Sequence, residues 1–196
     1  MKYDIYLVGV GGQGILTIGE ILATAAEQNN LPVSFYPSKG MAQRGGFVRA
    51  QLRLGRSGAG PNIPQRGADL AVSMELSEAL KAIRYTRPGG DFLLFADVWA
   101  PTQVMLGKAD YPAREAIENE IRAAGLRLIT IDPSALPVHE KTPVAPNVFI
   151  LGLLIKHTEL GKLFTPKMVE DVIDARWKKA SAANRFAFQK GMEFVL

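Results

Sequence analysis

Cysteine is absent from this sequence of 196 residues, and its absence excludes several kinds of site. Without thiols the chain forms no disulfide bond, no cysteine-ligated zinc site and no thiolate-bound iron–sulfur cluster. The two histidines, His139 and His157, stand alone in the sequence, so neither is assigned a catalytic role. No Ser/His/Asp or Cys/His set is apparent, and we predict neither a catalytic residue nor a metal site in this chain.

Long apolar segments are also missing. The longest, at 148–155, is far too short to span a bilayer, and no secretory signal is visible at the amino terminus. We therefore expect a soluble, cytoplasmic protein with no membrane partner. A hydrophobic content of 47% over 196 residues is enough for one domain with a real core.

Acidic residues are absent between Glu27 and Asp69. This stretch has a net charge of +6, which leaves the rest of the chain at −2 from a total of +4. Its basic residues are Lys39, Arg44, Arg49, Arg53, Arg56 and Arg66. A block of one sign predicts an anionic partner such as a phosphate, a coenzyme or an acidic protein surface. Aromatic residues do not alternate with these basic residues, and Trp99 is expected to be a packing residue, not a platform on which bases stack. Nucleic acid is therefore not an expected partner.

The order of predicted elements indicates an α/β fold. Apolar stretches typical of strands occur at 3–10, 31–36, 47–54, 69–74, 91–98 and 126–131. Helical patterns follow three of them, at 11–28, 75–85 and 112–124, and the second of these helices is expected to end at 88–90. Strands separated by helices predict a three-layer α/β/α arrangement with a mostly parallel, mixed sheet.

Residues 47–54 alternate in a way that predicts a strand with two different faces. Phe47, Arg49, Gln51 and Arg53 fall on one face, and aliphatic residues fall on the other. Because little chain precedes this strand for a helical crossover, we expect it to run antiparallel to its neighbours. A solvated polar face explains the pattern as well as a subunit or coenzyme contact does, so both interpretations stay open.

Beyond Asp132 the pattern becomes helical. Three helices are expected. The helix at 148–157 is apolar nearly all round and so buried, the helix at 165–177 starts with Thr-Pro, and the last helix lies at 180–194. Asn147 is the candidate N-cap of the first of them. We expect a single domain, 1–196, made of an α/β core at 1–132 and a helical carboxyl-terminal part at 133–196.

The first of two glycine-rich motifs follows the first predicted strand. Gly9, Gly11 and Gly14 form a G-x-G-x-x-G pattern, with Gly12 and Gln13 between them, at the start of a predicted helix. Backbone N–H groups in such a turn can face an anion. The second predicted strand ends without an Asp or Glu to hold a ribose, so NAD is not expected. A tight, closely packed turn and a contact with some other anion or nucleotide both stay open.

The second motif, KGMAQRGG at 39–46, places an arginine among glycines. Glycine permits positive φ and the close approach of another backbone, so Arg44 is predicted to be held for a bidentate contact with a carboxylate or phosphate. An ordinary surface turn is the alternative. The residues predicted to face a partner or coenzyme come from both motifs and from the arginine-bearing face of 47–54: Gly9, Gly11, Gly12, Gln13, Gly14, Gly40, Met41, Gln43, Arg44, Gly45, Gly46, Arg49 and Arg53. We expect the two motifs to lie close together at the carboxyl ends of the strands.

Together these motifs resemble the gamma-domain family of 2-oxoacid:ferredoxin oxidoreductases. The resemblance rests on GVGGQGIL and KGMAQRGGFVRAQLRLG and covers nearly the whole chain, at 9–16, 39–55, 67–80, 145–154 and 184–191. Within the family it is strongest to the small free-standing form, the beta subunit of indolepyruvate ferredoxin oxidoreductases. Lys39 and Phe47 stand where the family has His and Ser, a change that bears on the local anion site and the substrate class.

The resemblance implies an accessory role for this chain. Enzymes of the family oxidatively decarboxylate 2-oxoacids to acyl-coenzyme A and pass the electrons to ferredoxin. Thiamine diphosphate, Mg²⁺ and iron–sulfur clusters belong to the large partner subunit, and the gamma domain approaches coenzyme A and the active-site region. The isolated chain is thus expected to bind no cofactor, to be inactive and to meet ferredoxin only indirectly.

Several functional alternatives stay open at this point. The implied substrate is indolepyruvate or another arylpyruvate, and the alternatives within the family are 2-oxoglutarate, pyruvate and branched-chain oxoacids. A free-standing nucleotide-binding module is the alternative from another class. The face with Arg49 and Arg53 also offers a surface through which an isolated chain can form a homodimer.

Overall fold

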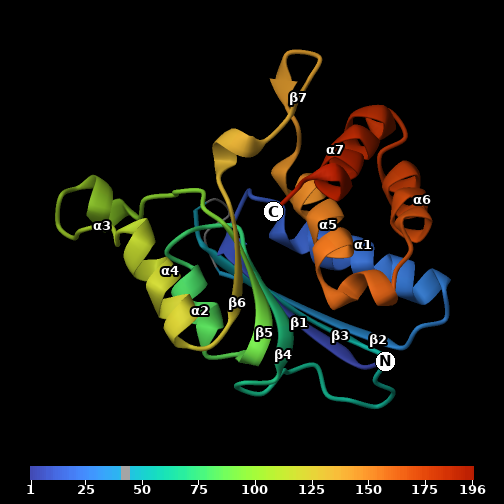
Figure 1. The fold of residues 1–196 in the computed structure, drawn as a ribbon, viewed down its shortest axis with the longest axis horizontal. Helices are drawn as coiled ribbons and strands as arrows, with labels where there is room; N and C mark the ends of the chain where they lie inside the picture. The colour runs from blue at the N-terminus through green and yellow to red at the C-terminus, as the bar shows by residue number, and fades with distance from the viewer. Residues whose placement is uncertain (41–44) are drawn as a thin grey trace.

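A six-stranded sheet runs through the computed structural model, which describes residues 1–40 and 45–196 (Figure 1). In sheet order, the strands are β2 (Val33–Lys39), β3 (Phe47–Leu54), β1 (Tyr3–Val10), β4 (Ala68–Ser73), β5 (Thr86–Phe95) and β6 (Arg127–Ile131). The pairs β1–β4, β4–β5 and β5–β6 are parallel, whereas β3 runs antiparallel to both β1 and β2. The predicted mixed sheet and the predicted reversal of the strand at 47–54 are both confirmed.

Helices cover both faces of this sheet, which confirms the predicted three layers (Figure 1). The helices are α1 (Ile15–Gln28), α2 (Ala79–Ile83), α3 (Thr102–Met105), α4 (Arg114–Ala123), α5 (Pro146–His157), α6 (Pro166–Arg176) and α7 (Ser181–Glu193). Because side chains alternate along a strand, Ile5 and Leu7 of β1 pack on the side of α1, α5, α6 and α7, and Tyr6 and Val8 pack on the side of α2 and α4. In the described part of the chain, no helix is long and apolar enough to cross a membrane.

The carboxyl-terminal helices pack against α1 and against each other. As predicted, Thr165 caps α6 by accepting a hydrogen bond from the Met168 amide at 3.4 Å, with Pro166 in the first turn. Helix α5 is buried over almost its whole circumference. Its Gly152 faces Gly191 of α7, and a Cβ on either glycine would run into the backbone of the other helix. Small residues therefore let these two helices approach closely.

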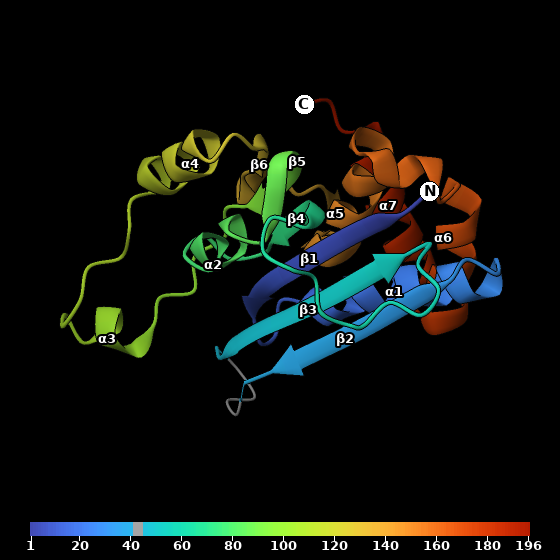
Figure 2. The same ribbon diagram turned by 90° about the horizontal axis from the view of Figure 1, so that it is seen from below.

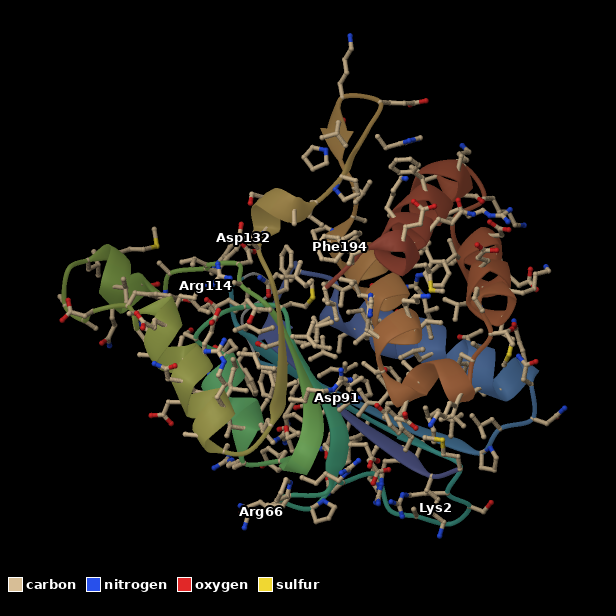
Figure 3. The ribbon with its side chains drawn as sticks, in the orientation of Figure 1. Lys2, Arg66, Asp91, Arg114, Asp132 and Phe194 are labelled. Atoms are coloured by element: carbon tan, nitrogen blue, oxygen red, sulfur yellow. The ribbon has the colours of Figure 1, made fainter. Side chains whose placement is uncertain are left out.

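A group of charged side chains joins the start of α4 to the end of β6. Arg114 donates to the Glu118 carboxylate at 2.9 Å and to the Asp132 carboxylate at 2.7 Å (Figure 3). Burial raises the pKa of Glu118, but hydrogen bonds from Arg114 and Arg122 lower it, and together they hold this pKa below its usual range. Hydrogen bonds from Ser134 and then Arg114 lower the pKa of Asp132 to about 2.

The helix predicted at 75–85 is much shorter in the structure, where only α2 is helical. Glu75 turns its side chain inward and accepts hydrogen bonds from Ser77 Oγ at 2.8 Å and from the Glu78 amide at 2.9 Å. Local bonds of this kind compete with the helical hydrogen-bond ladder. The first turn of the predicted helix is therefore replaced by a side-chain-stabilised turn.

Two other sequence predictions are also wrong. Residues 88–90, predicted to end a helix, lie inside β5, where the register with β4 shifts and the regular ladder is interrupted. Proline and glycine are tolerated at such irregular positions in a sheet. Asn147 does not cap α5, because Ala145 occupies the N-cap position and the Asn147 amide donates instead to the Gly14 carbonyl at 3.4 Å.

Candidate functional site

The two glycine motifs meet at one end of the sheet, as the sequence predicts. Because β1 and β3 are antiparallel, the end of β1 lies beside the start of β3. The Gly11 amide donates to the Gly46 carbonyl at 2.9 Å, and the Gly45 amide donates to the Gly11 carbonyl at 3.3 Å. The Gly40 amide closes the same end by donating to the Phe47 carbonyl at 3.0 Å. The predicted site residues Met41, Gln43 and Arg44 lie outside the described residues.

Gln13 ties the first motif to the neighbouring strands. Its Oε1 accepts from the Val10 amide at 3.0 Å. Its Nε2 donates to the Met74 carbonyl at 2.7 Å and to the Asp97 carboxylate at 3.0 Å. Both amide hydrogens of Gln13 are thus used inside the chain, so we assign this side chain a structural role instead of a contact with a cofactor.

Close packing explains two of the glycines in this turn. A Cβ on Gly9 would lie 2.9 Å from Gln13 Oε1, and a Cβ on Gly14 would lie 2.5 Å from Asn147 Nδ2. Gly14 also has a φ of 75°, a conformation that L side chains rarely adopt. Of the two interpretations that the sequence leaves open, these contacts favour the tight strand-to-helix turn.

A cavity of about 620 Å³ opens beside the first motif. It lies beyond the carboxyl ends of β1, β4 and β5, where ligands bind in open α/β sheets. Its lining consists of Gly11, Gly12, Gln13, Gly14, Met74, Phe95, Asp97, Trp99, Ala145, Pro146 and Asn147. The carboxylate of Asp97 lies in this lining, and its negative charge disfavours a phosphate. Trp99, which was expected to pack, lies against Gly45 but is 46% exposed.

Part of the acid-free stretch is neutralised inside the chain. Arg53 donates to the carboxylate of Asp4 at 3.1 and 3.3 Å, and Arg56 donates to the same carboxylate at 3.0 Å. Asp4 itself is 1% exposed. This ion-pair group lies at the end of β3 away from the glycine motifs. Arg53 is therefore engaged within the chain, although the sequence analysis placed it on a surface facing a partner.

The loop at 55–67 covers the face of β3 that carries these polar residues. Arg53 donates to the Gly60 and Asn62 carbonyls at 2.8 and 3.0 Å. Gln51 is 3% exposed, and its Oε1 accepts from the Ile63 amide at 2.6 Å. This face, which the sequence left open as either solvated or in contact with a partner, is thus largely closed by the chain itself. Arg49, nearer to the glycine motifs, remains half-buried.

A buried carboxylate that the sequence analysis missed lies close to the cavity. Glu75 is 0% exposed, and the described residues show no ion pair to it. Its four hydrogen-bond donors are Ser77 Oγ at 2.8 Å, the amides of Glu78 and Trp99 at 2.9 and 3.1 Å, and the Tyr111 hydroxyl. Burial, and then the hydrogen bond to Glu75, raise the pKa of Tyr111, so the hydroxyl stays protonated and donates.

The donor set of this chain does not fit an iron–sulfur cluster or a thiamine diphosphate–magnesium site. The sequence contains no cysteine. Within residues 1–40 and 45–196, no group of three His, Cys, Asp or Glu side chains is placed to hold a metal ion. Asp97, the acidic side chain of the cavity, already accepts hydrogen bonds from Gln13 and from the Val98 amide. We therefore derive no chemical step from such a group in this chain.

Comparison with known proteins agrees with this fold. The family model described as pyruvate ferredoxin/flavodoxin oxidoreductase matches residues 4–194. The chain belongs to the pyruvate ferredoxin/flavodoxin oxidoreductase family. The resemblance inferred from the two glycine motifs is thereby confirmed at the level of the family.

This family member is similar to two archaeal proteins over most of their length. One is indolepyruvate oxidoreductase subunit IorB of Archaeoglobus fulgidus, 36% identical over 173 residues, which are 88% of this chain and 85% of that protein. The other is the subunit of the same name from Pyrococcus horikoshii, 32% identical over 194 residues, which are 98% of this chain and 95% of that protein.

Solved structures share the fold of this family member at low sequence identity. The pyruvate oxidoreductase subunit PORC of Thermotoga maritima is 19% identical, with a TM-score of 0.70 and coverage of 100% of this chain and 97% of that chain. The 2-oxoglutarate:ferredoxin oxidoreductase of Magnetococcus marinus is 18% identical, with a TM-score of 0.64. That match covers 98% of this chain and 30% of the other, so the shared fold is one part of a longer chain there.

Proposed function

We propose that this family member is the accessory subunit of an indolepyruvate-type 2-oxoacid:ferredoxin oxidoreductase of the cytoplasm. In the proposed reaction the 2-oxoacid loses carbon dioxide, coenzyme A takes the acyl group and ferredoxin takes the two electrons. The observation that carries the proposal is the similarity to the Pyrococcus horikoshii subunit, which spans 98% of this chain and 95% of that protein.

We assign the chemistry to a larger partner subunit that holds thiamine diphosphate, Mg²⁺ and iron–sulfur clusters. The absence of cysteine supports this division, because clusters of this kind are held by thiolates. In this assignment no residue of the accessory subunit is catalytic, and ferredoxin meets only the partner. The residues proposed to face the partner or its coenzyme A are Gly11, Gly12, Gly14, Gly40, Gly45, Gly46 and Arg49, together with Met41, Gln43 and Arg44, which lie outside the described residues. We leave out Gly9, which is buried in β1, and also Arg53 and Gln13, whose side chains are engaged inside the chain.

Two alternatives have less support. A gamma subunit for pyruvate or 2-oxoglutarate is supported only by fold similarity at 19% and 18% identity. A free-standing nucleotide-binding module is disfavoured because the Gly11 amide is already paired with Gly46 and because Asp97 lines the cavity. Both of these features oppose the binding of a phosphate at the first glycine motif.

Reconstitution tests the proposal. The purified chain, the large subunit from the same organism and the complex of the two are each assayed for ferredoxin reduction with coenzyme A present. The 2-oxoacids compared are indolepyruvate, phenylpyruvate, pyruvate, 2-oxoglutarate and 2-oxoisovalerate. We expect turnover by the complex only, with the highest kcat/KM for an arylpyruvate. A higher kcat/KM for another oxoacid supports the second candidate, and full turnover by the chain alone contradicts an accessory role.

Calorimetry of the isolated chain tests the other alternative, a free-standing nucleotide-binding module. Titrations with NAD, a flavin nucleotide and coenzyme A are expected to show no submicromolar binding in the absence of the partner. Submicromolar binding of NAD supports a nucleotide-binding module instead.

A further inference from the structure

Residues 98–110 form an arm that leaves the body of the molecule between β5 and α4 (Figure 2). Helix α3 lies in this arm and buries none of its residues. In the described part of the chain, the backbone hydrogen bonds of 101–108 begin and end within the arm. Four large apolar side chains are exposed along it: Val98 at 54%, Trp99 at 46%, Met105 at 76% and Leu106 at 63%. The fold of this chain thus provides these side chains with little apolar cover.

Both ends of the arm are held by one buried carboxylate. Glu75 accepts from the Trp99 amide at 3.1 Å at one end and from the Tyr111 hydroxyl at the other. The Leu76 amide also donates to the Asp97 carbonyl at 2.8 Å, just before the arm begins. Because these bonds start from the turn that follows β4, the direction in which the arm leaves the sheet is set by the core of the fold.

The composition of the arm is typical of the centre of a protein interface. Residues 98–107 contain no charged side chain. Charged residues are depleted at interface centres, where tryptophan and methionine are enriched. An exposed arm of this composition is unfavourable in water unless another surface covers it.

We propose that the arm 98–110 is a docking element for the large subunit of the oxidoreductase and that Glu75 is the residue that positions it. The inference rests on the proposed function. The arm is continuous with the surface assigned to the partner, because Trp99 also lines the cavity beside the first glycine motif. The indole also lies against Gly45, where a Cβ would be 2.7 Å from its Nε1.

The extent of the arm favours the large subunit over a second copy of this chain. A stable interface takes roughly 20–30 residues from each side, which is more than the arm contains, so further surface has to be covered with it. The adjoining surface is the cavity and the glycine motifs, which are proposed to face the large subunit. In the Magnetococcus marinus structure the same fold makes up 30% of the chain, so there it is joined to further polypeptide.

A charged substitution at the tip of the arm tests the docking role. The double variant Met105→Asp, Leu106→Asp is compared with Val195→Asp, Leu196→Asp, whose side chains are also exposed, at 84% and 56%. Binding to the purified large subunit, which carries thiamine diphosphate and iron–sulfur clusters, is measured by calorimetry. We expect binding at least about 10-fold weaker for the arm variant, as for a truncated hot spot, and unchanged binding for the control.

Each result of this comparison has a distinct meaning. Equal binding by the arm variant and the unaltered chain overturns the inference and leaves the proposed function intact. Failure of the unaltered chain itself to bind the large subunit refutes the proposed function, and the inference with it. If sedimentation shows a homodimer that the arm variant alone abolishes, while large-subunit binding is unchanged, a second copy covers the arm and the inference is also overturned.

The positioning role of Glu75 is tested through its hydroxyl donor. Tyr111→Phe removes the bond to Glu75 at one end of the arm and also the bond that the Ser77 amide donates to the same hydroxyl at 3.1 Å. Tyr36→Phe, on an exposed tyrosine, is the matched control. In a Trp177→Phe background, we expect Tyr111→Phe to shift the emission of Trp99 and to weaken large-subunit binding by about 3- to 10-fold, the usual effect of losing the hydrogen bond that holds the arm. A role only in stability lowers the midpoint of thermal unfolding without changing either readout, and that result contradicts the assignment.

Discussion

Replacement of Asp4 by alanine is predicted to destabilise this chain by about 3–5 kcal/mol, the usual cost of breaking one side of a buried ion pair. The carboxylate is 1% exposed and accepts hydrogen bonds from Arg53 and Arg56. Without it, the Arg53 guanidinium remains in a site where its side chain is 12% exposed, and it loses the carboxylate that it pairs with. The free energy of unfolding falls because a buried cation loses its partner.

The expected magnitude lies in the lower part of this range. The side chain of Arg56 is 30% exposed, so water can solvate that guanidinium after the substitution. Arg53 also keeps its hydrogen bonds to the Gly60 and Asn62 carbonyls. A loss of about 3 kcal/mol corresponds to a fall of roughly 6–12 °C in Tm for a chain of this size. Urea unfolding at neutral pH measures the same loss as a lower midpoint at an unchanged m-value.

An exposed ion pair is the control for this experiment. Lys167 and Asp171 pair on the surface of α6, where their side chains are 76% and 52% exposed, so Lys167→Ala is expected to cost less than about 0.5 kcal/mol. If Asp4→Ala costs no more than this control, the ion-pair group is not what holds the loop 55–67 on β3. Arg53 then returns to the set of residues available to a partner.

Two further predictions concern the glycine turn and the charged group on α4. Gly14→Ala is expected to lower the free energy of unfolding by about 1–3 kcal/mol, because Gly14 has a positive φ and a Cβ there would meet Asn147. Adding Asn147→Ala removes this contact but not the backbone strain, so it should restore only part of the lost stability, as measured by chemical unfolding. The lowered pKa values of Glu118 and Asp132 mean that their pairing with Arg114 stabilises the fold above pH ~4 and loses this effect as pH falls toward 2. Arg114→Gln should therefore lower Tm at pH 7 and change it little near pH 2, and an equal difference at both pH values would contradict this assignment.

Local patterns in the sequence predict most of the fold. The alternation at 47–54 and the Thr-Pro start of α6 each act over a few residues, and both are found in the structure as expected. The two glycine motifs were also correctly expected to meet, because parallel strands place their carboxyl ends at one edge of the sheet. The family follows from the same short segments.

Predictions that depend on distant partners are less successful. The charge of the acid-free stretch is evident in the sequence, but nothing in the order of residues indicates that Arg53 is neutralised by Asp4, 49 positions away. Similarly, Glu75 is part of a pattern that resembles the start of a helix, and its partner Tyr111 lies 36 residues further on. Such pairings depend on which strands become neighbours.

The sequence by itself therefore determined the order of the elements, the reversed strand β3, the absence of thiolate chemistry and the family. Only the tertiary structure decided that Gln13 binds Asp97, 84 positions away, and that the arm 98–110 leaves the body with its apolar side chains exposed. The physical reason is that backbone patterns arise from interactions over a few residues, whereas the pairing and burial of side chains depend on the whole packed sheet.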